Sequence, residues 1–216
     1  MNLSIGRFVG AGAALLALGG CAVDERSTTM TTNPQWAMEN IPLNRNAAQF
    51  SNFTDEHLAW ADTLLKQTLA VTGPRTLDNT LVPLNEMWMH LDMVASQSEL
   101  FSQAHPDEAV RSAAEDGSKR VSEFVTALWL NPDLYKAYTD VDLKRADAAT
   151  KFMVEKAVRD FRREGVDREP AVRERIKQIN KEIVDIGLTF KRNISEDTRF
   201  IEVESPSDLA GLPQDY

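Results

Sequence analysis

Apolar residues recur at helical spacing through most of the chain beyond Phe53. The first run has four such residues, which fall on one face of a helix: Leu58, Ala61, Leu65 and Leu69. Thr54 precedes this run and is placed to cap the helix with its hydroxyl, and Thr72-Gly73-Pro74 follows it as a break. The pattern therefore predicts a first helix that begins at Thr54.

Breaking and capping residues divide the next part of the chain. A second helix is expected to open near Asn79-Thr80 and to end at His105-Pro106. Asp107 is then placed to cap a third helix, because its carboxylate can accept from the first free backbone N–H groups. Asn131 and Pro132 are typical of a cap and a first helical position, so they predict a short fourth helix.

Two longer helices are expected after that. The fifth runs from about Leu143 to Glu164, with Gly165 as its carboxy-terminal cap. The sixth has apolar residues in alternating steps of four and three: Val172, Ile176, Ile179, Ile183, Ile186 and Phe190. This seam predicts lengthwise packing against a neighbouring helix of the same chain, with a dimerising coiled coil as the alternative. Alternation of polar and apolar residues from Arg199 to Glu204 predicts one short strand. The expected fold is all-α and bundle-like.

Composition and charge narrow the class of protein. The 216 residues are 43% hydrophobic and 26% charged, which is typical of a folded domain. The formal net charge is −9, so the basic surface that binds phosphates is missing and nucleic acid is excluded as a partner. The acidic surface mainly favours solubility, although it would also suit cationic peptides.

The amino terminus resembles a bacterial lipoprotein signal. Arg7 precedes a short apolar run, and Leu18-Gly19-Gly20-Cys21 has the pattern of a lipobox. We expect residues 1–20 to be a signal peptide, Cys21 to be lipidated and residues 21–52 to form a tether. The alternative is an ordinary thiol after an uncleaved leader. The lipobox predicts a bacterial cell-envelope protein that is anchored to a membrane through Cys21, in the outer membrane and facing the periplasm.

The last part of the chain carries a motif. Five residues form an NxxEDTxF pattern: Asn193, Glu196, Asp197, Thr198 and Phe200. A second pattern follows it: Leu209, Gly211, Leu212, Pro213 and Asp215. Together with His105-Pro106 upstream, these residues resemble the thimet oligopeptidase, neurolysin and oligopeptidase A family of zinc metallopeptidases. The resemblance implies that residues 53–198 are the helical amino-terminal region of such a peptidase and that residues 199–216 begin the next region.

Zinc chemistry requires residues that this sequence does not supply. The usual zinc motif is HExxH, whose two histidines share one helix face. His57, His90 and His105 are the three histidines, and no two of them lie four residues apart. No serine or cysteine nucleophile stands in a suitable context, and His90 with Asp92 points to two different helix faces. We therefore expect no catalytic or metal-binding residue and no cofactor in this chain, with zinc in a missing catalytic domain.

Three functional interpretations remain. The first is the amino-terminal portion of a lipid-anchored zinc oligopeptidase that cleaves short peptides, in which this part forms the substrate-selecting channel wall. The second is a non-catalytic helical lipoprotein that binds peptides or a partner protein. The third is one half of a split peptidase whose zinc-bearing carboxy-terminal half is a separate chain.

Overall fold

The computed structural model describes residues 44–197, 199–200, 202–205 and 209–211. Its helices follow one another in this order: α1 (Ala47–Leu69), the π-helical turn η3 (Leu77–Leu81), α2 (Val82–Ala104), α3 (Glu108–Trp129), α4 (Pro132–Thr139), α5 (Ala148–Glu164) and α6 (Pro170–Ser195). The described residues contain no β-strand, only an isolated bridge between Arg75 and Val141. The predicted all-α fold is confirmed.

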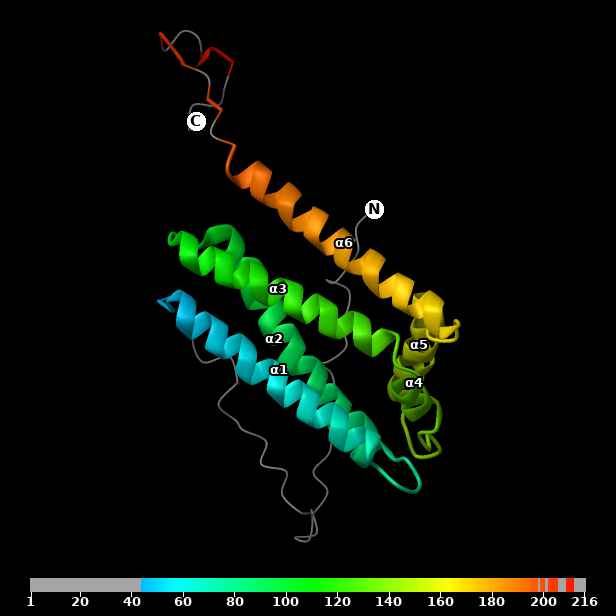
Figure 1. Ribbon diagram of the computed structural model, residues 1–216. Helices are drawn as coiled ribbons and strands as arrows, with labels where there is room; N and C mark the ends of the chain where they lie inside the picture. The colour runs from blue at the N-terminus through cyan, green and yellow to red at the C-terminus, as the bar shows by residue number, and fades with distance from the viewer. Residues whose placement is uncertain (1–43, 198, 201, 206–208, 212–216) are drawn as a thin grey trace.

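The helices form a body of three with the others placed around it (Figure 1). Helices α1, α2 and α3 pack against one another, with α2 in contact with both of its neighbours in sequence. Helices α4 and α5 lie together at one end of this body, and α6 lies along α3. The connections make α1 and α2, and then α2 and α3, antiparallel neighbours, as expected of a helical bundle.

Helix α1 begins earlier than the sequence predicted. The side chain of Asn46 accepts from the Gln49 backbone N–H at 2.9 Å, and the Gln49 side chain accepts from the Asn46 backbone N–H at 2.9 Å. This reciprocal pair satisfies two backbone donors that the helix itself leaves free. Thr54, the predicted cap, is instead buried within the helix, so part of the predicted tether is helical.

Most of the other predicted caps are found. Asp107 caps α3 by accepting from Ala109 N–H at 2.9 Å, and Asn131 caps α4 with Pro132 as its first residue. Gly165 ends α5 with φ 96°, a left-handed conformation that a side chain disfavours. Helix α5 itself begins at Ala148 rather than near Leu143, because Asp147 caps it.

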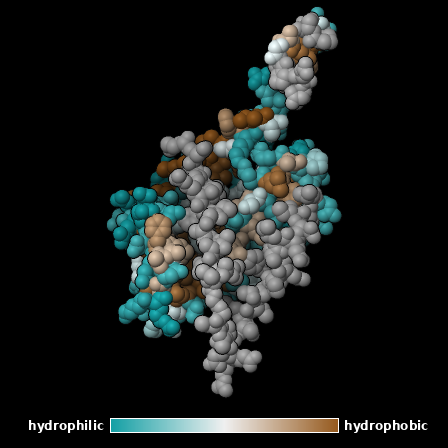
Figure 2. Space-filling view, turned by 180° about the vertical axis from the view of Figure 1, so that it is seen from behind, coloured by the Kyte–Doolittle hydropathy of each residue, from teal (hydrophilic) through white to brown (hydrophobic). Residues whose placement is uncertain are grey.

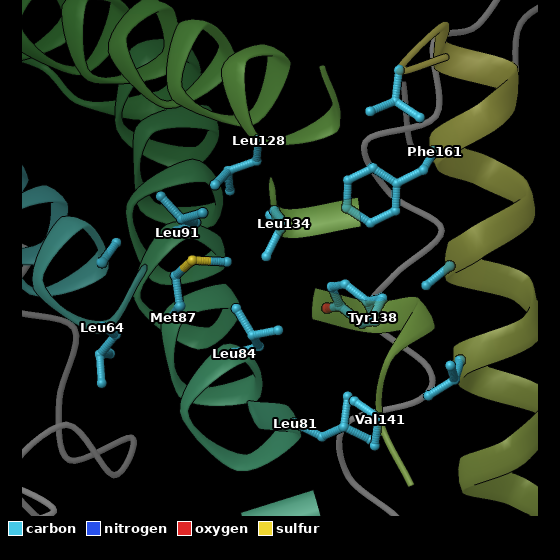
Figure 3. Close-up of a cluster of buried hydrophobic side chains, with 14 residues drawn as sticks. Leu64, Leu81, Leu84, Met87, Leu91, Leu128, Leu134, Tyr138, Val141 and Phe161 are labelled. Carbon is cyan, nitrogen blue, oxygen red and sulfur yellow. The ribbon is translucent and has the colours of Figure 1, made fainter. Parts of the chain in front are cut away.

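The main hydrophobic core joins the three-helix body to α4 and α5 (Figure 3). Leu64 of α1, Leu84, Met87 and Leu91 of α2, and Leu128 of α3 meet Leu134 and Tyr138 of α4 and Phe161 of α5. The Phe161 ring packs edge-on to Trp129 at a centroid distance of 4.7 Å. Full burial of such side chains stabilises the fold by about 1.5–3 kcal/mol each, so this core holds α4 and α5 against the body.

Hydrogen bonds also connect two loops at the end of the body where α4 and α5 lie. The Asp142 backbone N–H donates to the Arg75 carbonyl at 2.9 Å, next to the Arg75–Val141 bridge. The Arg75 guanidinium also donates to the Thr68 carbonyl at 3.0 Å, near the end of α1. The loop before η3 and the loop after α4 are therefore fixed to each other.

The predicted strand after α6 is wrong for the residues that can be described. Arg199, Phe200, Glu202 and Val203 have no strand conformation, and Figure 1 shows this segment leading away from the helices. A strand needs the N–H and C=O groups of a neighbouring strand, and the part of the chain that the structure describes provides none beside it. The alternation of residue types alone could not supply that neighbour.

No helix among the described residues combines the length and the apolar character needed to pass through a bilayer.

Candidate functional site

Helices α2, α3 and α6 meet around a polar hollow of about 340 Å³. Its lining comes from the end of α2, the start of α3 and the end of α6: Ser102, Gln103, Ala104, His105, Glu108, Arg111, Ser112, Glu115, Arg192, Ser195 and Glu196. We call it the corner hollow. It brings together His105 and Glu196, two motif residues that are far apart in the sequence.

The turn between α2 and α3 is fixed by its own polar groups. The Arg111 guanidinium donates to the carbonyls of His105 at 2.8 Å and Pro106 at 2.9 Å. The Asp107 backbone N–H donates to His105 Nδ1 at 3.1 Å. These bonds satisfy the carbonyls of the turn that follows α2, so the motif residues His105 and Pro106 act structurally here.

Ion pairs attach helix α6 to α2 and α3 beside the corner hollow. Arg192 donates to Glu115 of α3, and Lys191 Nζ lies 2.7 Å from Glu99 of α2. The hydrogen bond that Arg192 donates to Glu115, followed by the negative charge of Glu115, raises the pKa of Arg192. Because Arg111 and Arg192 are both engaged by chain groups, the corner hollow has the character of a joint between helices rather than of an anion site.

The other predicted motif residues lie in the last turn of α6 and in the segment that follows it. Asn193 lies in the last turn of α6, and Glu196 is its carboxy-terminal cap. The Asp197 carboxylate accepts from the backbone and guanidinium of Arg199, which lowers the pKa of Asp197. Phe200 is 85% exposed. Gly211 has φ 102°, which a side chain disfavours.

Four of the predicted site residues lie outside the described part of the chain: Cys21, Thr198, Leu212 and Pro213. Lipidation of Cys21 stays a prediction.

The described residues contain no group of three or more histidine, cysteine, aspartate or glutamate side chains placed to hold a metal ion. A catalytic zinc site uses three protein ligands and an open position for water. The residues described here do not fit that requirement, so no catalytic step is derived through zinc in this chain.

The structure places two histidines together, which the sequence did not predict. His57 of α1 and His90 of α2 have their Nδ1 atoms 3.0 Å apart. Phe53 packs on His57 and the Trp60 ring stacks on His90. Burial, with the nearby charges of His90 and Arg45, lowers the pKa of His57 to about 4, and burial also lowers the pKa of His90. Both rings are therefore neutral at pH 7, when one Nδ1–H donates to the other Nδ1.

Helix α6 leaves its apolar seam uncovered. Six large side chains are between 39% and 69% exposed: Val172, Ile179, Ile183, Ile186, Phe190 and Ile194. We call this the α6 apolar face. Figure 2 shows hydrophobic residues gathered beside the point where the carboxy-terminal segment leaves the body. The predicted packing of this seam against a helix of the same chain is wrong within the described residues, since α6 has no buried residue and turns its other side to α3.

Known proteins similar to this chain are peptidases. A thimet-like oligopeptidase from Dictyostelium discoideum is 26% identical over 187 residues, which cover 82% of this chain and 28% of the relative. Oligopeptidase A from Escherichia coli is 25% identical over 197 residues, 85% of this chain and 28% of the relative. Human mitochondrial intermediate peptidase is 29% identical over 146 residues, 62% of this chain and 20% of the relative. No family model matches the chain.

The resemblance predicted from the motifs is confirmed by these relatives. The chain spans less than a third of the length of each of them.

The predicted location in a bacterial cell envelope is wrong. The relatives include mitochondrial intermediate peptidases from Homo sapiens and Malassezia globosa, which are eukaryotic proteins. The short apolar run before Cys21 suggested the bacterial outer membrane, and this set of relatives does not support it.

Proposed function

We propose that this chain is the amino-terminal portion of a zinc metallo-oligopeptidase that cleaves short peptides, and that it forms a substrate-selecting wall. The observation that carries the proposal is the similarity to oligopeptidases across 82% and 85% of this chain, which matches only 28% of either relative. A region of that extent accounts for one part of a peptidase, with the catalytic part elsewhere.

The chain's own contribution is shape and rigidity. The core shared by α1 to α5 holds these helices in fixed positions, as a wall that sorts peptides by size requires. Zinc, held by the other part, supplies the chemistry by lowering the pKa of a bound water towards ~7. The net charge of −9 favours the approach of cationic peptides to the wall.

The proposal is tested by isolating the protein from its native cells through a tag on this region. The purified material is expected to hydrolyse short fluorogenic peptides, to lose that activity with a chelator and to recover it with zinc. Residues 1–216 expressed alone serve as the control and are expected to show no hydrolysis. Absence of zinc-dependent hydrolysis from the native material would contradict the proposal.

A split peptidase is the second candidate. The exposed α6 apolar face favours it as much as it favours a single longer chain, because either arrangement provides a surface to cover that face. The same purification separates the two. A peptidase polypeptide that carries this region as its own amino terminus supports one chain, whereas two bands of separate sequence support a split enzyme.

Lipid attachment at Cys21 is a separate proposal, supported by the Leu18-Gly19-Gly20-Cys21 pattern alone. Intact-mass spectrometry of the native protein tests it. A mass increase by acyl chains that the Cys21→Ser variant lacks is the expected result, and identical processing of the two proteins would contradict it.

A further inference from the structure

Helix α6 has two faces of opposite character. From Lys181 onward, its charged face is joined to α2 and α3 by ion pairs, which include Lys181–Glu123 at 2.9 Å, Lys119–Asp185 at 2.5 Å and Lys191–Glu99 at 2.7 Å. The α6 apolar face points away from these pairs and is open to solvent in the described structure. In a globular protein, an amphipathic helix usually turns its apolar side to the core and its charged side to solvent.

The open face is too extensive to be ordinary surface. Isolated apolar side chains on a protein surface need no explanation. Here Ile179, Ile183 and Ile186 lie on successive turns of one helix, and Phe190 and Ile194 extend the same patch. A continuous exposed patch of this kind marks a surface that another part of a protein covers.

The spacing along the face specifies the kind of surface that fits it. Steps of four, three and four residues join Ile179, Ile183, Ile186 and Phe190. Side chains at this spacing form one row of knobs that insert between the side chains of a helix lying lengthwise. Gly187 lies next to this row and no atom approaches the position where its Cβ would be, so the backbone there is accessible to a close neighbour.

We propose that the α6 apolar face is the docking surface for an apolar helix of the zinc-bearing part of the same peptidase. This inference rests on the proposed function. The relatives that match 82% and 85% of this chain are more than three times as long as the matched part, so they contain further protein that could cover such a face. A second copy of the chain is disfavoured, because two copies that each carry a net charge of −9 repel one another.

The experiment places a photo-crosslinking amino acid at Ile186, which is 69% exposed, in the full protein expressed in its native cells. The matched control carries the same group at Phe152 of α5, which is 64% exposed and lies off the α6 apolar face. After irradiation, the crosslinked peptides are identified by mass spectrometry. A crosslink from position 186 to a polypeptide region that belongs to an HExxH peptidase is expected, at least tenfold more abundant than from position 152.

Other outcomes overturn the inference. A crosslink to a second copy of α6, a crosslink to residues 1–43, or no excess over the Phe152 control each assigns the face to something else. The paired variants Ile183→Glu with Ile186→Glu give an independent measurement, with Phe152→Glu as control. We expect at least a tenfold loss of the peptidase activity that co-purifies with the tagged region, and circular dichroism checks that the variants remain folded.

Failure of this inference is distinguishable from failure of the proposed function. Zinc-dependent activity that co-purifies normally with the glutamate variants leaves the function in place and moves the docking surface elsewhere. Absence of co-purifying activity even from the unchanged protein removes both.

Discussion

The three-helix body and α6 are built from similar sequence patterns but end in opposite environments. Helices α1, α2 and α3 bury their apolar stripes against one another, with Phe50, Leu84 and Val110 almost fully covered. Helix α6 has an equally regular apolar stripe and no buried residue. The body is held by apolar contact and α6 by ion pairs on the surface.

This difference separates two kinds of information in a helical pattern. Periodicity determines which side of a helix is apolar, because the side chains have fixed angular positions. It does not determine what covers that side. In the body the apolar stripes are buried within the chain, whereas on α6 the stripe is exposed among the described residues.

The largest effect is expected from two phenylalanines, one in the main hydrophobic core that joins α5 to the body and one on α6. Phe161 is 0% exposed and Phe190 is 64% exposed. Phe161→Ala leaves a cavity in the main core, so we expect a loss of about 3–5 kcal/mol in the free energy of unfolding. Phe190→Ala is expected to change it by less than about 0.5 kcal/mol. Urea denaturation followed by circular dichroism measures both, and similar losses for the two variants would show that α6 is packed.

Two glycines offer the next comparison, with effects of opposite sign. A Cβ at Gly117 of α3 would lie 2.6 Å from Ser98 Oγ and 3.1 Å from Thr54 Oγ1, so helices α1 and α2 would have to move or rearrange. Gly117→Ala is therefore expected to destabilise by about 1–3 kcal/mol.

Gly187→Ala is the matched control, because no atom lies within 4 Å of its Cβ position on α6. Alanine favours the helix over glycine by up to about 1 kcal/mol, so this change is expected to stabilise the chain. Thermal melts of the two variants test the pair. Destabilisation by both changes would mean that the accessible side of α6 is covered.

Acidification is expected to weaken the three-helix body through His57. The pKa of His57 in the fold is about 4, below its ordinary value of 6.5, so the unfolded chain binds more protons between these values. Stability is therefore fully present above pH ~6.5 and is lost as the pH falls towards 4. Since His57 keeps contact with solvent, we expect a loss of about 1–2 kcal/mol rather than the full ~3 kcal/mol of the shift.

His57→Gln tests the origin of that loss. Gln cannot gain a proton, so the pH dependence of urea midpoints between pH 7 and pH 4.5 is expected to flatten in the variant. An unchanged slope would assign the acid sensitivity to other groups.

The smallest effect is expected from the ion pairs of α6. Lys181 Nζ lies 2.9 Å from Glu123, and both side chains are largely exposed. Exposed pairs contribute about 0–1 kcal/mol and are screened by salt. Lys181→Ala should therefore lower the melting temperature by a few degrees at most, and less at 1 M NaCl. A large effect that persists in high salt would indicate that α6 is attached by more than surface charge.

Local features of the fold were predictable from the sequence, and contacts between distant helices were not. Asp107, Asn131 and Gly165 were identified as caps because a cap depends only on one residue and the backbone of the next turn. The start of α1 at Ala47 was missed, since the Asn46 and Gln49 pair lies in a polar stretch without apolar periodicity.

The site illustrates the same limit. The motif residues His105 and Glu196 are visible in the sequence, but their meeting in the corner hollow depends on how α6 crosses α2 and α3. His57 and His90 pair across two antiparallel helices, and only the relative rotation of α1 and α2 brings their rings together. The pair could have been found in the sequence only by aligning the first two predicted helices as antiparallel neighbours and noting that His57 and His90 then lie opposite each other.

The bridge between Arg75 and Val141 has a consequence for the order of folding. It closes a loop of 66 residues (141 − 75), whose closure entropy costs about 4 kcal/mol by the chain-length relation. Contacts of α1 with α2 and of α2 with α3 join neighbours in sequence and include shorter loops, so we expect them to form first and the bridge to form late. Val141→Ala, which removes buried side-chain contacts next to this bridge, should then speed unfolding much more than it slows refolding in stopped-flow kinetics. The connection between these two loops is therefore expected to slow unfolding and so to prolong the lifetime of the folded chain.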